Sequence, residues 1–191
     1  MHRMLDAAEV LLDAGGTDAL TVDAVVRDAD ASIGSFYARF GDRQGLVVAL
    51  QDRFLRRLDE SLGPAFQPAD DSDLETALGY VVASFLAAFR SNRQAFVAFV
   101  LVNRSEPPMR ARGARASFAA ASAIARLLER HADEVAHPDP ELAADVVYRT
   151  LFAMAMQTVM FDDGEISRHV VTDDELARET TRLVLAYLRA P

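Results

Sequence analysis

Two short runs of sequence, Thr21-Val-Asp-Ala-Val-Val-Arg-Asp-Ala29 and Ser32-Ile-Gly-Ser-Phe-Tyr-Ala-Arg-Phe40, decide the fold of the N-terminal part of the chain. Each run begins with Thr or Ser, a good helix N-cap, because the side-chain oxygen can accept a backbone N–H of the first turn. Apolar residues then recur at helical spacing. Only Asp30 and Ala31 separate the runs. The pattern predicts two short helices joined by a tight turn, which is the layout of a helix-turn-helix.

Further helices are expected on both sides of this stretch. Before it, apolar residues keep helical spacing from Met4 to Gly15-Gly16, where glycine favours a helix end. After it, a helix is expected from Gly41-Asp42 through Phe54, followed by a breaker-rich loop over 63–73. Longer helices are predicted over 73–91, 92–104, 107–133, 139–161 and 173–189, with a loop at Asp162–Glu165. Since no stretch alternates strictly enough for a strand, the whole chain is predicted to be all-α.

The second short helix is expected to enter the major groove of DNA, which is about 12 Å wide. A helix reaches base edges only if one of its sides is thin. The thin face is formed by Ile33, Gly34, Ser35 and Ala38, flanked by Tyr37 and Arg39. Phe36 and Phe40 would point the other way, into the core of a three-helix module. Arg43 begins the next helix, where its guanidinium can meet a phosphate.

Together with Asp42-Arg-Gln-Gly-Leu46, these runs resemble the DNA-binding motif of the TetR family of transcriptional regulators. That motif runs roughly Thr-x-x-x-Ile-Ala, then Ser-x-Gly-Thr-Leu-Tyr-x-x-Phe, then Lys-x-x-Leu. The resemblance implies a helix-turn-helix DNA-binding domain over residues 1–48 and a helical ligand-binding and dimerisation domain over residues 49–191. It further implies a homodimer that binds double-stranded operator DNA, by default as a repressor, and leaves it when a small hydrophobic effector binds.

The resemblance also assigns roles to single residues. Thr21, Tyr37 and Arg43 would contact phosphates. Ser32, Ile33, Gly34, Ser35 and Arg39 would lie at or near base edges. Asp30 and Ala31 replace the usual Gly-Val of the turn, so Asp30 must adopt a left-handed conformation, which Asp does more readily than most residues. Ile33 stands where polar residues are frequent, and it either reads a thymine methyl group or simply packs.

The net charge of −9 limits how this chain can bind DNA, because phosphate contacts require Lys or Arg. Residues 1–57 contain seven Arg against nine Asp and Glu, and the chain has no Lys. Binding must therefore depend on where a few arginines sit. The acidity is the main support for the alternative function, a helical ligand-binding protein that does not bind DNA.

Other classes of protein find little support in the sequence. The absence of Cys excludes disulfides and thiolate metal sites. Glu134-Val-Ala-His137 is a single Glu-x-x-His pattern, whereas di-iron bundles need two, and His131 and His169 are expected in surface or loop positions. Hydrolase motifs and phosphate-binding glycine loops are missing. With no signal-peptide pattern and no apolar run of about eighteen residues, we expect a cytoplasmic, non-enzymatic protein without cofactor or metal and without a membrane partner.

The last two predicted helices are expected to form the dimer interface as a four-helix bundle with their two-fold mates. Residues 142–160 are apolar nearly all round, more than one core can absorb, and 173–189 add a second apolar stripe. The interface is assigned to Leu151, Met160, Leu176, Thr180, Leu183, Val184 and Tyr187.

An apolar effector pocket is expected in the C-terminal domain. Phe85 and Phe89, like Phe96 and Phe99, are spaced to share a helix face, and other aromatic and Met side chains could converge on them. The predicted lining is Phe85, Phe89, Phe96, Phe99, Asn103, Met109, Phe118, Tyr148, Phe152, Met156 and Gln157. Asn103, Tyr148 and Gln157 would meet one polar group of the ligand. Ordinary core packing is the alternative role for each of these residues.

Overall fold

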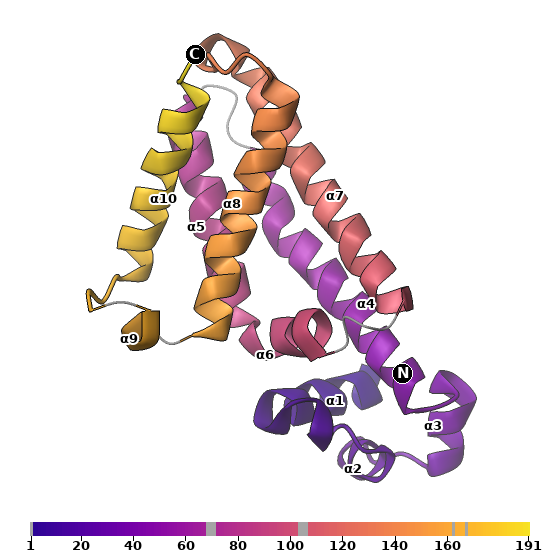
Figure 1. Ribbon diagram of the computed structural model, residues 1–191. Helices are drawn as coiled ribbons and strands as arrows, with labels where there is room; N and C mark the ends of the chain where they lie inside the picture. Colours follow the sequence, from indigo (N-terminus) through magenta and orange to yellow (C-terminus); the bar gives the residue numbers. More distant parts are fainter. Residues whose placement is uncertain (1, 68–71, 103–106, 162, 167) are drawn as a thin grey trace. The chain divides into compact units, whose positions relative to one another are not determined.

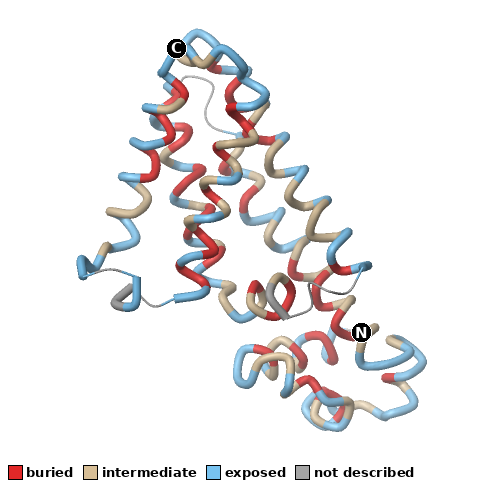
Figure 2. Tube along the Cα trace, viewed as in Figure 1, coloured by how far each residue is buried: buried red, intermediate tan, exposed pale blue. Residues whose placement is uncertain are grey.

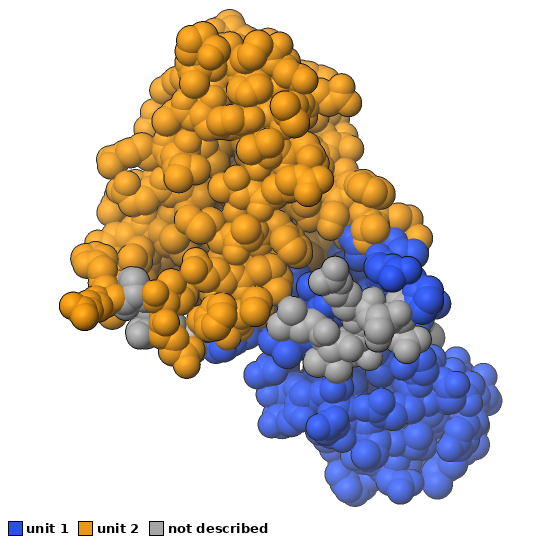
Figure 3. Space-filling view, in the orientation of Figure 1, with its two compact units in different colours: residues 1–57, 93–113 blue, residues 58–92, 114–191 orange. Residues whose placement is uncertain are grey.

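The computed structural model describes residues 2–67, 72–102, 107–161, 163–166 and 168–191, and within these ranges every regular element is helical (Figure 1). The prediction of an all-α fold is confirmed. Packing divides the chain into two compact units (Figure 3): unit 1 contains residues 1–57 and 93–113, and unit 2 contains residues 58–92 and 114–191. No helix in the described ranges is long and apolar enough to cross a bilayer.

The two packing units do not follow the expected division of the chain into residues 1–48 and 49–191. Residues 93–113 pack in the same unit as the N-terminal helices, although they lie far along the sequence. A packing unit need not coincide with a functional domain, because a segment of one domain can pack into the core of another. The functional division at residue 48 therefore stays a prediction.

Unit 1 is built from short helices and from parts of two long ones. Its elements are α1 (His2–Gly15), η1 (Gly16–Ala19), α2 (Val22–Asp28), α3 (Ile33–Phe40), most of α4 (Arg43–Leu62), α6 (Arg93–Phe96), the π-helical segment η3 (Val97–Val102) and the start of α7 (Pro107–Arg130). The prediction of a helix over 92–104 is confirmed from Arg93 to Val102, but the second part, η3, has the wider π-helical turn, and residues 103 and 104 lie outside the described residues. Residues 97–102 are all apolar, so their spacing could not show whether the helix would be α or π.

The N-terminal helices α1 to α3 and the start of α4 bury one apolar core. Its fully buried side chains include Leu5, Leu12, Leu20, Val25, Phe36 and Leu46. The predicted N-caps are confirmed: Thr21 Oγ1 accepts the N–H of Ala24 at 3.2 Å, and Ser32 Oγ accepts the N–H of Ser35 at 3.1 Å. Each cap stabilises its helix by about 1 kcal/mol. The starts of α2 and α3 are thus set by local hydrogen bonds.

Unit 2 contains the longer helices. Its elements are the end of α4, η2 (Gly63–Phe66), α5 (Leu74–Ser91), most of α7, η4 (Ala132–Glu134), α8 (Pro140–Met160), α9 (Asp163–Ile166) and α10 (Asp173–Leu188). α5 packs against both α8 and α10, and Figure 2 shows buried positions recurring along α5 and α8. The loop expected at Asp162–Glu165 is wrong in part, because α9 forms there, and so short a helix has no apolar period to reveal it.

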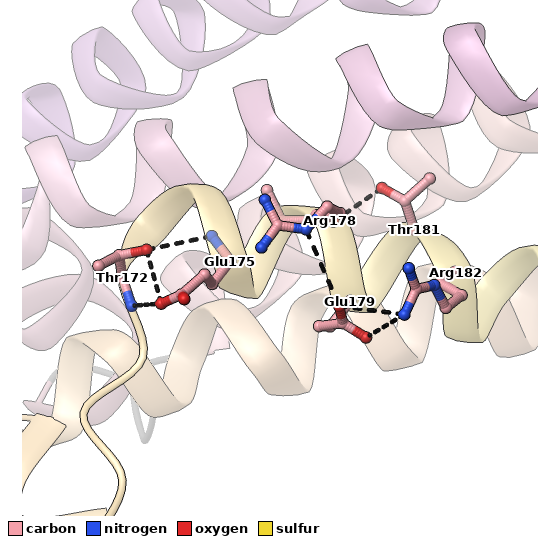
Figure 4. Close-up of polar contacts among 7 residues, drawn as sticks. Thr172, Glu175, Arg178, Glu179, Thr181 and Arg182 are labelled. Atoms are coloured by element: carbon pink, nitrogen blue, oxygen red, sulfur yellow. Dashed lines mark hydrogen bonds and ion pairs between the residues drawn. The ribbon is translucent and has the colours of Figure 1, made fainter.

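The last helix, α10, begins with a capping box (Figure 4). Glu175 Oε2 accepts the N–H of Thr172 at 2.9 Å, and Thr172 Oγ1 accepts the N–H of Glu175 at 3.3 Å. The bonds from the backbone and hydroxyl of Thr172 hold the pKa of the Glu175 carboxyl below its ordinary value, because they favour the charged carboxylate. This reciprocal pair fixes where α10 begins.

The start of α4 passes very close to the end of α3. Asp42 Oδ1 accepts the N–H of Gly45 at 2.7 Å and so caps α4. A Cβ added at Gly45 would lie 1.9 Å from the carbonyl oxygen of Phe40, far inside van der Waals contact. Between the two helices, Gly41 has a φ of 75°, which residues with a side chain rarely adopt. The junction therefore depends on glycine at two positions.

Gly45→Ala is expected to lower the free energy of unfolding by about 1–3 kcal/mol, because the new methyl group must displace the backbone of Phe40. Gly34→Ala is the matched control, since nothing lies within 4 Å of its added Cβ and alanine is favoured over glycine in a helix. Urea unfolding followed by circular dichroism measures both variants. If the Gly45→Ala and Gly34→Ala variants had equal free energies of unfolding, the backbone of Phe40 would not be held rigidly against the start of α4.

Candidate nucleic-acid interface and ligand-binding residues

α3 buries one side and exposes the other. Phe36 is fully buried, and its ring centroid lies 5.1 Å from that of Phe40. Ile33 and Tyr37, which flank this buried ring, each leave 51% of their surface exposed. Ser32, Gly34, Ala38 and Arg39 are also exposed, and Ser35 is half-buried. The structure therefore brings the residues predicted at base edges together on the accessible side of α3.

The turn between α2 and α3 is a Schellman motif with Asp30 at its left-handed position. Asp30 has a φ of 48°, the only positive value at a non-glycine residue in the described chain. The N–H of Ala31 donates to Val26 O at 2.9 Å, and the N–H of Asp30 donates to Arg27 O at 3.2 Å. The prediction that Asp30 takes a left-handed conformation is confirmed. This turn sets how α3 leaves α2.

The arginines predicted to meet DNA have different surroundings. Arg39 is exposed, and no residue of the described chain forms an ion pair with it. The Arg43 guanidinium already has partners, since Nε donates to the backbone carbonyl of Leu20 at 2.8 Å and Nη2 donates to that of Thr17. Arg27 is paired with its neighbour Asp28 at 2.8 Å. Of these three arginines, Arg39 is thus the one with neither an ion pair nor a hydrogen bond to another described residue, whereas Arg43 keeps its charge but has its guanidinium held by carbonyl groups.

Comparison with known protein families covers most of the chain. A family model described as bacterial regulatory proteins of the tetR family matches residues 4–50, which include the whole of α2 and α3. A second model, described as the tetracyclin repressor-like C-terminal domain, matches residues 73–188. The chain belongs to the TetR family. No curated protein matches this TetR-family chain significantly.

Solved structures of bacterial regulators share its fold at low sequence identity. PfmR from Thermus thermophilus gives a TM-score of 0.69 at 21% identity, covering 96% of this chain and 97% of its own. A TetR/AcrR-family regulator from Thermobifida fusca gives 0.74 at 15% identity, covering 99% and 98%. The fatty acid degradation regulator FadR from Bacillus halodurans gives 0.72 at 17% identity, covering 98% and 99%. These similarities establish the fold of the TetR family over the chain.

Part of the predicted ligand-binding set forms an aromatic cluster in unit 2. Phe85 and Phe89 stack along α5 with ring centroids 4.7 Å apart, and Phe152 of α8 meets Phe89 edge-on at 5.7 Å. Tyr148, one turn before Phe152, lies 6.4 Å from Phe85. Burial raises the pKa of the Tyr148 hydroxyl, against the smaller opposite effect of its hydrogen bond with Ser117. The cluster thus combines apolar rings with one partly buried hydroxyl.

Three more buried residues of the predicted set, Phe96, Phe99 and Met109, lie in unit 1. Phe96 meets Phe54 edge-on at 5.0 Å, and Phe99 lies 5.5 Å from the same ring. Met109 is fully buried, and Gln51 Nε2 donates to its backbone carbonyl at 3.1 Å. The structure therefore divides the predicted lining into two groups, one in each unit. The spacing of apolar residues along each helix identified the members of both groups. It could not show that the two groups lie in the cores of different units.

Sequence reasoning missed Gln51 and Phe54. Gln51 is 2% exposed, and its Oε1 accepts no hydrogen bond from any residue that the structure describes. It shares one buried helix face with Val47, Leu50 and Phe54. A polar residue within an apolar helix face is itself a sequence signal, because a buried amide needs partners. The unpaired carbonyl oxygen makes Gln51 a candidate contact for a hydrogen-bond donor.

Four predicted ligand residues differ in their placement. Met156 is buried one turn beyond Phe152 on α8, whereas Phe118 is 70% exposed on α7. Gln157 is exposed on α8. Asn103 lies outside the described residues. Phe118 and Gln157 do not join either buried cluster, and their place in a ligand site stays a prediction. Spacing shows which residues share a helix face but not which face meets the core.

A groove of about 540 Å³ lies between α5 and α10, away from the aromatic cluster. Gly79 and Leu185 line it, together with Arg178 and Arg182. Glu179 is within 3.9 Å of Arg178 and 3.2 Å of Arg182, as Figure 4 shows. Because one carboxylate serves both guanidinium groups, the groove has less free positive charge than its arginines suggest.

The residues predicted at the dimer interface fall into different environments. Leu151, Thr180 and Val184 are fully buried inside unit 2, so they belong to the protomer's own core rather than to its surface. Met160 and Leu183 are exposed by 47% and 54%. Leu176 and Tyr187 are half-buried. Sequence periodicity identifies an apolar stripe on a helix. It does not show whether the helix that packs against this stripe belongs to the same chain or to a second copy.

The Glu-x-x-His pattern is used within the fold. Glu134 Oε1 accepts the N–H of Leu74 at 2.8 Å, and its Oε2 accepts from Arg189 at 3.1 Å. Among the described residues, no group of three or more His, Cys, Asp or Glu is placed to hold a metal ion. Of the two positions expected for His131, surface or loop, the loop position is confirmed, since it lies in the turn after α7; it is nevertheless buried, with both ring nitrogens within 3.0 Å of backbone carbonyl oxygens.

Proposed function

We propose that this TetR-family protein is a homodimeric repressor that binds double-stranded operator DNA through α3 and is released by a small hydrophobic effector. The observation that carries the proposal is the exposed surface of α3, where Gly34 lies opposite the buried Phe36 and Ile33 and Tyr37 each leave 51% of their surface exposed. We propose a regulator rather than an enzyme. Its place is the cytoplasm, where the DNA is.

The DNA contacts follow from exposure and charge. Base edges would be met by Ser32, Ile33, Gly34, Ser35 and Arg39, with Thr21 and Tyr37 on phosphates. The exposure of Ile33 favours contact with a thymine methyl group over packing within the protein, because a side chain half open to water gains by meeting an apolar group. Arg39, whose guanidinium forms no ion pair with a described residue, supplies positive charge at the DNA-facing helix of an acidic chain. Binding would therefore depend on few ionic contacts.

Variants at Tyr37 and Arg39 test this interface. Tyr37→Ala should weaken binding by a similar factor for all sequences, because phosphate contacts position without specifying. Arg39→Ala should cost about 1–3 kcal/mol and relax the preference at one base position. Arg57→Ala on α4, where Arg57 pairs with Glu9 at 2.8 Å, is the control and should leave binding unchanged.

The measurement begins with sequencing of the DNA that purified protein retains, followed by gel shifts on those fragments at several salt concentrations. Retention of no particular sequence, with no shift even at low salt, would refute the DNA-binding proposal. That result would leave the alternative, a helical ligand-binding protein.

Dimerisation is proposed through the outward faces of α8 and α10. Exposed large apolar side chains on or next to these helices are Leu142, Met160, Phe161 and Leu183. Apolar surface of this kind calls for a partner. A second copy is the partner that suits a helix-turn-helix protein, because two-fold symmetry presents two recognition helices to a two-fold operator. Met160 and Leu183 would lie in the interface, with the half-buried Leu176 and Tyr187 beside them.

Leu183→Arg is expected to give monomers, because a guanidinium placed in an apolar interface loses its hydration without gaining a partner. Val10→Arg on α1 is the matched control, since Val10 is similarly exposed (67%) and lies outside the proposed interface. Light scattering at micromolar concentration measures the mass of each variant. A dimeric Leu183→Arg protein would remove this face from the proposal.

The effector site is proposed at the aromatic cluster of α5 and α8. Phe85, Phe89 and Phe152 provide apolar rings, and Met156 provides a flexible thioether that can adapt to a ligand. Tyr148 would meet the one polar group of an otherwise hydrophobic molecule. The ligand must bind better to the form that does not fit the operator, because equal affinity for both forms would shift nothing.

Hydrophobic compounds that raise the melting temperature are expected to dissociate a preformed complex of protein and operator. Tyr148→Phe keeps the ring but removes the hydroxyl, so it should weaken binding of ligands with a polar group by about tenfold while sparing purely apolar ones. Thermal shift and fluorescence anisotropy of labelled operator measure the two effects. Ligands that stabilise the protein yet never change its affinity for operator would contradict the inducible mechanism.

A further inference from the structure

The chain enters α2 through η1, a turn with little packing of its own. None of the residues of η1 is buried. One side of it borders a hollow of about 180 Å³ that is lined also by Gln94, Val97 and Ala98. A segment with few apolar contacts is easily displaced. Another interaction is needed to hold the start of α2 in place.

Arg43, the first residue of α4, supplies that interaction. Its Nε donates to the carbonyl oxygen of Leu20 at 2.8 Å, and its Nη2 donates to the carbonyl oxygen of Thr17. Leu20 is fully buried and directly precedes Thr21, the N-cap of α2. The forked pair of bonds therefore ties both ends of the η1 turn to the start of α4.

The fork uses one of the two edges by which an arginine can hold a phosphate. Nε and Nη2 form the side edge of the planar guanidinium, which can hold an oxyanion with two parallel hydrogen bonds, as can the end edge formed by Nη1 and Nη2. Arg43 also gains nothing from its own helix, because a positive charge at a helix N-terminus opposes the helix dipole. The two carbonyl oxygens, which carry partial negative charge, offset that cost.

We propose that Arg43 is a positioning residue: it holds η1 and the N-cap of α2 against α4, so that α2 and α3 are set for DNA, and it does not itself bind a phosphate. This inference rests on the proposed DNA-binding function, but it assigns Arg43 a role different from the phosphate contact that the family resemblance implies. A movement of the first turn of α4 is then passed directly to the start of α2.

Operator binding by Arg43→Ala and Arg43→Lys, measured across a range of salt concentrations, tests the proposal. Both variants should bind about tenfold or more weakly, since an ammonium group lacks the planar fork that reaches two carbonyl groups. The slope of log K against log salt should equal that of the unmodified protein. A slope lower by about one unit for Arg43→Ala, with affinity restored by Lys, would show a phosphate contact and overturn the proposal.

Hydrogen exchange in the free protein separates this inference from the proposed function. Backbone amides of Leu20, Thr21 and Ala24 should exchange about tenfold faster in both variants, while amides of α8 serve as the unchanged reference. Unchanged exchange at these three amides would refute the positioning role whatever the protein does with DNA. Faster exchange in a protein that binds no operator would refute the proposed function and leave the positioning role intact. If Arg43→Ala fails to fold, Arg43→Lys still decides, because it keeps the charge and most of the side chain.

Discussion

The N-terminal module depends on the burial of one ring, that of Phe36. α3 has only eight residues and would not be stable as an isolated helix. Its stability comes from packing one face against the rest of the module, and on that face Phe36 is fully buried, with the half-buried Phe40 beside it. Because the helix is rigid, burying Phe36 turns Gly34 toward solvent and leaves Ile33 and Tyr37 at the edges of the buried face. A single packing contact therefore sets both the place of α3 and the face it presents.

Backbone contacts at the two ends of α3 set its direction. At its start, the left-handed Asp30 completes a Schellman turn after α2. At its end, Gly41 and Gly45 let α4 begin almost in contact with the carbonyl of Phe40. Arg43 then joins α4 back to the residues that precede α2. These hydrogen bonds, together with the close contact between α3 and α4, explain how a module of such short helices keeps a single arrangement.

Unit 2 is organised differently, because its helices are long enough to pack by their faces alone. α5 contacts both α8 and α10, and its Phe85 and Phe89 meet the rings of α8. This packing absorbs Leu151, Thr180 and Val184, which sequence periodicity had placed between two subunits. It leaves Met160 and Leu183 outside. The same apolar stripe thus contains core residues and surface residues side by side.

The sequence by itself determined the helices of the N-terminal module, their caps at Thr21 and Ser32, and the left-handed turn at Asp30, because these features depend on residues only a few positions apart. It could not determine the partners of Arg43, the burial of Gln51 or the exposure of Phe118, since each depends on which distant helix lies alongside. Only the tertiary structure placed Arg43 against the carbonyls of Thr17 and Leu20, more than twenty residues away. The physical reason is range: capping and turn conformation are local, whereas burial and pairing between helices exist only once the chain has closed on itself.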